Sequence, residues 1–309
     1  MDTVPYLFCD SVAETIAEIE DLSKQLASVD YSGFSLWKAT FRNHSDNRSS
    51  FYLCIEFYGG EWSYTVRNWK AGIIYEVDFA YLKQVNQKYL RIESVKFTSI
   101  FTQSEPSNRQ EIEEIIKYVS PFVNLANIAL DDTEIDEGNL SVLLSFFQRA
   151  SFKKITTFCY RQCYEDFLTP YLHSDCLKEV CVYGDNWSKH FQAELQQFIL
   201  KKPFRDIDCF QTHLVFDRSF FEELFEVNPS VEKVIFNGRF SFDYKDLKGF
   251  KKNLRSNSTG KTWKRVLNRF LDFLEGWPTI ESRSWKRNDG VWVTVSRYDR
   301  CLRIELFTK

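Results

Sequence analysis

The chain lacks the long apolar runs that cross a membrane, because nothing in its 309 residues approaches the ~18 consecutive apolar residues of such a helix. Its first residues, 1–5, also lack the positive charge and apolar stretch of a secretory signal peptide. These two absences predict no membrane partner and a cytoplasmic or nuclear location. In such a reducing compartment the eight cysteines need not form disulfides.

Familiar catalytic motifs are absent as well. The four histidines have no Cys, Ser or Asp partner at a recognisable spacing, and there is no G-x-S-x-G or H-E-x-x-H motif. The pairs Cys159/Cys163 and Cys176/Cys181 resemble parts of a zinc site, but zinc usually takes tight C-x-x-C turns, so small buried or half-buried thiols are expected. We therefore predict no catalytic residue, no cofactor, no metal and no enzyme activity.

Two short segments leave alternatives open. The acidic run 131–137 can hold a divalent cation or form a solvated loop, and the loop is favoured. Residues 259–262, Thr-Gly-Lys-Thr, resemble the end of a phosphate-binding loop. That motif requires a glycine where this chain has Arg255, so nucleotide binding is not expected.

What the sequence does contain is a recurring pattern, apolar-x-x-apolar-x-apolar. Its copies start at Leu125, Leu177, Phe204 and Val231, with a weaker copy at Phe152, so successive starts lie 27, 25, 27 and 27 residues apart. An earlier triplet with the same internal spacing occupies positions 92, 95 and 97. Each copy predicts a short strand.

Segments of helical spacing lie between these strands, at 109–119, 140–147, 167–172, 191–199 and 220–225. One strand and one helix per ~20–29 residues is the rhythm of leucine-rich repeats. The usual consensus asparagine is missing, so the predicted fold is α/β, an irregular leucine-rich-repeat-like solenoid. An ordinary α/β sheet with evenly spaced strands is the alternative.

The flanks of the repeats predict antiparallel strands. Residues 51–69 alternate on both sides of Gly59-Gly60 and predict a β-hairpin. Residues 277–309 predict a second hairpin that caps the last repeat. The resulting division is a helical segment at 1–41, a β-rich segment at 42–100, repeats at 101–241, and a basic helical segment with its C-terminal hairpin at 242–309.

Charge is distributed unevenly along the chain. The net charge is −3, yet residues 241–309 hold sixteen Lys and Arg against eight Asp and Glu. A basic patch within 245–269 can neutralise phosphates of a nucleic acid, bind an acidic protein, or form a solvated helical face. Its proposed members are Lys248, Lys251, Lys252, Arg255, Lys261, Lys264 and Arg265.

The first 41 residues resemble a divergent F-box. They begin with Val4-Pro5, continue through apolar positions at helical spacing, carry Asp21-Leu22 and reach a tryptophan at Trp37. Together with the repeats and the terminal hairpin, the chain is similar to the F-box and F-box-associated families of nematodes. The resemblance implies that an adaptor groove takes up apolar anchors. These anchors are Val4, Pro5, Phe8, Val12, Ile16, Leu22 and Trp37.

By this resemblance the chain is expected to be a non-catalytic substrate receptor of an SCF-type ubiquitin ligase. The N-terminal helices dock a Skp-type adaptor, and the repeats hold an unidentified protein target. An alternative for residues 1–41 is a helical cap on the first repeat. Alternatives for the whole chain are a repeat scaffold or inhibitor without ligase function, and nucleic-acid binding through 245–269.

Overall fold

The computed structural model describes residues 9–10, 12, 35–70, 73–99, 106–201, 204–209, 211–226, 233–242, 281–286, 291–297 and 302–307. Over these residues the chain is mixed α/β, with seven α-helices and a large sheet that is not closed. The chain divides into two compact units. Unit 1 contains residues 1–128 and 133–152, and unit 2 contains residues 129–132 and 153–309.

Unit 1 is built around a β-hairpin. Strands β1 (Ser49–Tyr58) and β2 (Glu61–Lys70) pair antiparallel across Gly59 and Gly60, whose φ angles of 59° and 87° favour glycine. The hairpin predicted from the sequence is therefore confirmed. Its neighbours are β3 (Ile73–Val77), β4 (Leu90–Thr98), β5 (Pro106–Ser107) and β6 (Val123–Leu130). The strand order is β6-β4-β1-β2-β3, with β4 parallel to β1 and β5 paired with β2.

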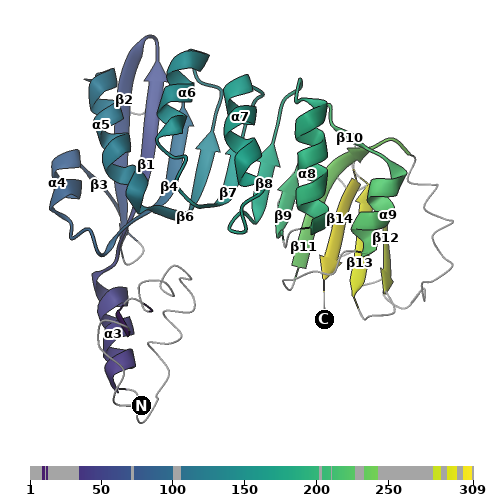
Figure 1. The fold of residues 1–309 in the computed structure, drawn as a ribbon, viewed down its shortest axis with the longest axis horizontal. Helices are drawn as coiled ribbons and strands as arrows, with labels where there is room; N and C mark the ends of the chain where they lie inside the picture. The colour runs from purple at the N-terminus through teal and green to yellow at the C-terminus, as the bar shows by residue number, and fades with distance from the viewer. Residues whose placement is uncertain are drawn as a thin grey trace. The chain divides into compact units, whose positions relative to one another are not determined.

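Capped helices accompany these strands. Asn108 begins α5 (Arg109–Val119) by accepting a hydrogen bond from the backbone of Glu111, as a helix N-cap does. The predicted helix 109–119 is confirmed, and its apolar positions are buried. The other helices of unit 1 are α3 (Ser35–Asn47), α4 (Phe79–Gln84) and α6 (Glu137–Ser145), with a 3-10 turn at Ser120–Phe122. Helices α5 and α6 lie on one face of the strands (Figure 1).

Unit 2 alternates parallel strands and helices. Its parallel strands are β7 (Phe152–Thr157), β8 (Glu179–Val182), β9 (Asp206–Asp208) and β11 (Lys233–Phe240). The connections contain α7 (Gln162–Tyr171), α8 (Lys189–Lys201) and α9 (Arg218–Glu226), and a short strand β10 (Val215–Phe216) pairs with β11. The helices lie on the same face of these strands (Figure 1). The strands and helices predicted between residues 152 and 241 are thus present.

The C-terminal strands extend the sheet of unit 2. Strand β14 (Leu302–Phe307) pairs antiparallel with β11, followed by β13 (Trp292–Arg297) and β12 (Glu281–Lys286). The β13–β14 pair confirms the predicted terminal hairpin and covers the edge of β11, while β12 adds a strand that the sequence did not predict. The predicted helix at 242–276 lies outside the described residues apart from Phe242.

The register in unit 2 confirms the pattern for the copies that start at Phe152, Leu177 and Phe204, and corrects it for the copy that starts at Val231. Ile155, Val180 and Ile207 stand side by side on β7, β8 and β9, as the repeat predicts. The residue opposite Ile207 on β11 is Phe236, whereas the pattern had placed Val234 there. The copy that starts at Val231 is therefore two residues out of register. A shift of two residues keeps the same side chains on the same face of the sheet.

Aromatic packing explains this shift. The ring of Phe236 is buried and lies 5.3 Å from the ring of Phe216 and 5.7 Å from that of Phe220, between centroids. A Cβ at Gly238 would come within 2.7 Å of the Phe236 ring, so the missing side chain leaves room for it. Large rings bury more apolar area than valine, so they set the register of the last parallel strand.

Candidate functional site

Few of the predicted adaptor-binding residues belong to the described part of the chain. Val12 is half-buried and helical, and Trp37 lies on α3, where its ring stacks on Phe41 at 5.9 Å. Outside the described residues lie the anchors Val4, Pro5, Phe8, Ile16 and Leu22. The seven residues of the predicted basic patch, from Lys248 to Arg265, lie outside them too.

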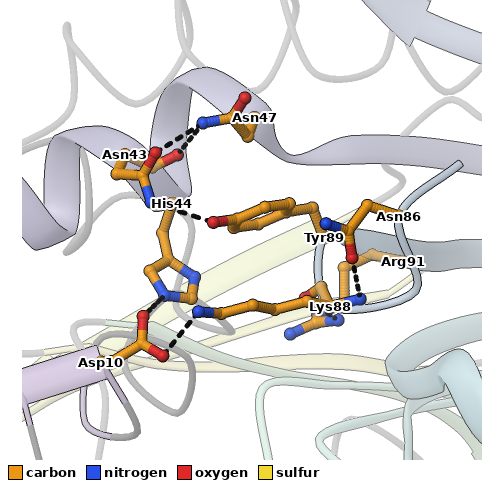
Figure 2. A network of polar contacts seen from close by, with 8 residues as sticks. All are labelled: Asp10, Asn43, His44, Asn47, Asn86, Lys88, Tyr89 and Arg91. Atoms are coloured by element: carbon orange, nitrogen blue, oxygen red, sulfur yellow. Dashed lines mark hydrogen bonds and ion pairs between the residues drawn. The ribbon is translucent and has the colours of Figure 1, made fainter. Parts of the chain in front are cut away.

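A polar cluster joins the described part of the N-terminal segment to the rest of unit 1. We call this cluster of Asp10, His44, Lys88 and Tyr89 the N-terminal clasp (Figure 2). Asp10 Oδ1 lies 2.9 Å from His44 Nε2 of α3, and Lys88 Nζ donates to Asp10 Oδ2 at 2.5 Å. The Tyr89 ring and the imidazole pack in a T-shaped contact with centroids 5.4 Å apart, and Asn43 Nδ2 donates to the Tyr89 hydroxyl at 2.9 Å.

The electrostatics of the clasp hold Asp10 in its charged form. The hydrogen bond from Lys88 lowers the pKa of Asp10, and His44 adds to this effect against the opposing effect of burial. The side chain of His44 is only 1% exposed. The histidine therefore forms part of a joint within the protein, with little access for a substrate.

Backbone bonds complete this joint at the beginning of β1. The Arg48 amide donates to the His44 carbonyl, and the Ser49 amide donates to the Tyr89 carbonyl, both at 3.0 Å. The side chain of Asn86 accepts from the Lys88 amide at 3.1 Å and shapes the loop before β4. The clasp thus ties the helical stretch around Asp10 to the loop that leads into β4.

A second polar surface lies in unit 2. Side chains alternate along a strand, so the residues next to Ile155, Val180 and Ile207 point away from the face that these apolar residues share with the helices. The register aligns these outward side chains in rows across β7, β8 and β9. With the two residues that follow β7 and β8, they form the polar strand face: Lys154, Thr156, Phe158, Glu179, Cys181, Tyr183, Asp206 and Asp208.

The register aligns Lys154, Glu179 and Asp206 in one row of the polar strand face, and this row has more carboxylate groups than lysines. Lys154 Nζ pairs with Glu179 Oε2 at 3.3 Å, and Arg205 Nη1 lies 3.8 Å from Glu179 Oε1. Beside them, Asp206 Oδ1 is buried and accepts no hydrogen bond from any residue that the structure describes. Burial, followed by the charges of Asp208 and Glu179, raises the pKa of Asp206 to about 6. The positive charges of Lys154 and Arg303 oppose this rise only in part.

An exposed aromatic pair borders the carboxylates. The ring of Phe158 is 51% exposed and stacks on that of Tyr183, with centroids 5.7 Å apart and planes 13° apart. The Tyr183 hydroxyl donates to Asp208 Oδ2 at 3.4 Å. Burial and the nearby charge of Asp208 raise the pKa of Tyr183, so the hydroxyl keeps its proton and remains a donor. Aromatic and acidic groups therefore adjoin on one surface.

Two of the cysteines considered as zinc ligands, Cys159 and Cys181, lie in surroundings that keep their thiols protonated. Cys181 is buried and points away from Val180 and Val182, as its place in the strand predicts, and burial raises its pKa to about 12. Burial also raises the pKa of Cys159 to about 11. Both groups are therefore protonated, weakly nucleophilic thiols at neutral pH. Over the described ranges, no grouping of three or more His, Cys, Asp or Glu side chains is arranged to hold a metal ion.

Members of the acidic run 131–137 have structural partners. Asp136 accepts from the Asn139 amide at 3.0 Å and caps α6. In unit 1, Glu134 accepts from the Gly59 amide at 2.8 Å, and in unit 2, Asp132 lies 3.5 Å from Arg161. These bonds engage three carboxylates of the run and favour the loop over the cation site.

The comparisons with known proteins add no relative. No family model matches the chain, and neither the curated proteins nor the solved structures contain a match. Within the part of the chain that the structure describes, no helix is long and apolar enough to span a membrane. The function is therefore inferred from the polar strand face and the N-terminal clasp.

The sequence pattern held a signal for one of these surfaces. The non-apolar positions of each repeat copy include Glu179, Cys181, Asp206 and Asp208, which alternation assigns to the face away from the helices. The clasp had no comparable signal, because Asp10 lies 34 residues from His44 and 78 from Lys88.

Proposed function

We propose that the chain is a non-catalytic protein-interaction module that acts as the substrate receptor of an SCF-type ubiquitin ligase. The observation that supports it most directly is the polar strand face, where parallel strands present charged, hydroxyl and aromatic side chains away from the helices. Repeated strand–helix units commonly bind macromolecules through such a surface. The regular register of Ile155, Val180 and Ile207 supports the finer description of the fold as an irregular leucine-rich-repeat-like solenoid.

The proposed adaptor-binding segment is residues 1–41, on the strength of its resemblance to an F-box. The clasp supports this assignment, because Asp10 holds the segment to His44 and Lys88. A segment attached through a joint of fixed geometry presents its apolar anchors in a defined direction. The adaptor contacts of Val4, Pro5, Phe8, Val12, Ile16, Leu22 and Trp37 follow from the resemblance and belong to this proposal.

Capture of a purified Skp-type adaptor by the full chain tests this assignment. We expect the wild-type chain to retain the adaptor and the double variant Pro5→Ala/Phe8→Ala to lose most of it, because two apolar anchors are removed from the contact. Val142→Ala is the matched control, since Val142 is an exposed apolar residue on α6. Retention of the adaptor should be unchanged in this control.

Two results would count against the receptor assignment. If the intact chain does not retain the adaptor, the ligase role is wrong and a repeat scaffold or inhibitor becomes the better description. If the double variant retains the adaptor as well as Val142→Ala does, residues 1–41 are not the docking segment. Circular dichroism of each variant separates loss of binding from loss of folding.

A further inference from the structure

Strand β3 of unit 1 is an edge strand whose apolar side chains are exposed. It pairs antiparallel with β2, and with no further strand among the described residues. Ile73 and Ile74 are 56% and 54% exposed, and Tyr75 is 46% exposed. Successive side chains of a strand point to opposite faces, so apolar groups meet solvent on both faces of this edge. An open apolar edge of this kind is a template for pairing with another strand.

The backbone of β3 determines what kind of element can cover it. In an antiparallel pair the residues alternate between those that exchange hydrogen bonds with the partner strand and those that do not. The second set directs its N–H and C=O groups away from β2, toward the open side of the edge. A row of alternating donors and acceptors is satisfied by another β-strand, whereas a helix has no free backbone groups along its side.

The edge strand of unit 2 shows how this chain treats an edge that stays unpaired. Strand β12 pairs only with β13 among the described strands, and its six residues include Glu281, Arg283 and Lys286. Charged residues of this kind keep an edge from pairing. Strand β3 contains one charged residue, Glu76, and Arg67 of β2 holds it at 3.0 Å. Head-to-tail pairing of β3 with β12, which would build an open fibre, is therefore disfavoured.

The sequence of β3 fits antiparallel pairing with itself. When Tyr75 faces Tyr75 of a second copy on a two-fold axis, Ile73 faces Val77 and Ile74 faces Glu76. The two Glu76 carboxylates are then about 7 Å apart along the strands, and each keeps its own Arg67. A shift that set Glu76 against Glu76 would place like charges directly opposite, which destabilises a strand pair. Charge and aromatic pairing thus select the register centred on Tyr75.

We propose that two copies of the chain pair through β3 and form a symmetric dimer in which the two edge strands join antiparallel at Tyr75. The contact is about one strand wide, so it belongs to the weak interfaces below ~1,200 Å², and we expect a dissociation constant on the order of 100 µM. The dimer goes beyond the proposed function, because it depends on neither the adaptor nor the target.

Sedimentation equilibrium of the full chain, from about 5 to about 500 µM, tests the proposal. The weight-average mass should rise from that of one chain toward that of two. Ile74→Glu and Ile74→Lys form a matched pair, because both remove the same exposed apolar side chain. The first places a negative charge opposite Glu76 of the second copy, and the second a positive one. We expect Ile74→Glu to dimerise at least about tenfold more weakly than Ile74→Lys.

A control variant and a disulfide trap locate the contact. Val142→Lys, at an exposed apolar position of α6, should dimerise like wild type. Residues directly opposite each other lie about 4.5–5.5 Å apart between Cα atoms, so Tyr75→Cys should give a disulfide-linked dimer on mild oxidation. In Ile73→Cys the two thiols are about 13 Å apart along the strands, so this variant should not cross-link. Wild type, oxidised in parallel, reports any link through the native cysteines.

Each outcome decides for or against the dimer. A chain that stays monomeric at about 500 µM overturns it and leaves the edge to a strand of another protein. A mass that keeps rising beyond two copies means head-to-tail growth and excludes the two-fold pairing. Equal dimerisation of Ile74→Glu and Ile74→Lys, or equal cross-linking of Tyr75→Cys and Ile73→Cys, excludes β3 or the proposed register. Circular dichroism checks that each variant is folded, and adaptor capture reports separately on the proposed function.

Discussion

The N-terminal clasp and the polar strand face each centre on one aspartate, and the protein treats the two in opposite ways. Asp10 has a lysine and a histidine within 2.9 Å, and the hydrogen bond from Lys88 lowers its pKa. Asp206 has an oxygen without a donor in the described residues, and burial raises its pKa to about 6. The charge of Asp10 therefore stabilises the folded chain, whereas the charge of Asp206 destabilises it.

This difference helps to distinguish structure from function. The charge of Asp10 in the clasp stabilises the fold, and this structural role is enough to account for it. A charge that lowers stability is typical of sites where the protein binds something else. We therefore predict that replacing aspartate by asparagine lowers the free energy of unfolding at position 10 and raises it at position 206.

Of the two aspartate substitutions, the one at the clasp is expected to have the larger effect on stability. Asp10→Asn should lower the free energy of unfolding by about 2–3 kcal/mol, because the Lys88 ammonium and the buried His44 lose a charged acceptor. Urea denaturation followed by fluorescence measures the change. Asp46→Asn, at an exposed position of α3, is the control and should change stability by less than about 0.5 kcal/mol. Equal stability of the two variants would remove the clasp as a stabilising joint.

At the polar strand face, replacing aspartate by asparagine should change the free energy of unfolding in the opposite direction. Asp206→Asn should raise the free energy of unfolding at pH 7 by about 1–3 kcal/mol, since the neutral amide avoids the cost of a buried charge beside Asp208 and Glu179. Asp185→Asn, an exposed position that follows β8, serves as the control. A destabilised Asp206→Asn would mean that the carboxylate has a stabilising partner and would contradict the comparison.

Acidification should remove the two effects in different pH ranges. The folded-state pKa of Asp206 is raised to about 6, so its destabilising charge is present above pH 6 and disappears as the pH falls toward about 4. The folded-state pKa of Asp10 is lowered, so its contribution persists above the unfolded pKa of about 4 and is lost only below it. Unfolding free energies of both variants relative to wild type, measured from pH 7 to pH 4, check this order. If both variants lost their difference in unfolding free energy from wild type over the same pH range, this prediction would be wrong.

How far the sequence predicts the structure depends on whether a feature is periodic. Alternation around Gly59-Gly60 and the spacing of α5 reflect local geometry, and the structure confirms both. The register of β11 depends on contacts between Phe236 and the rings of Phe216 and Phe220, and the spacing of apolar residues along a strand does not reveal such contacts. The pattern therefore placed Val234 opposite Ile207, which is wrong by two residues.

The same distinction applies to the candidate sites. Asp206 and Asp208 flank the apolar Ile207, so the repeat pattern alone is enough to assign them to the outward face. The missing donor at Asp206 Oδ1 is a three-dimensional property that no sequence period contains. His44 has no partner at a catalytic spacing in the sequence, because the residues that it contacts lie far along the chain.

The smallest effect on stability is expected at the aromatic border of the polar strand face. Phe158→Ala should change the free energy of unfolding by less than about 0.5–1 kcal/mol, because half of the ring is already exposed and only its stacking on Tyr183 is lost. Phe236→Ala, in the buried aromatic cluster of the same unit, should lower it by about 3–5 kcal/mol. Thermal and urea unfolding measure both variants. A Phe158 variant as unstable as the Phe236 variant would show that the ring is part of the core, and its exposure would then no longer support a binding surface.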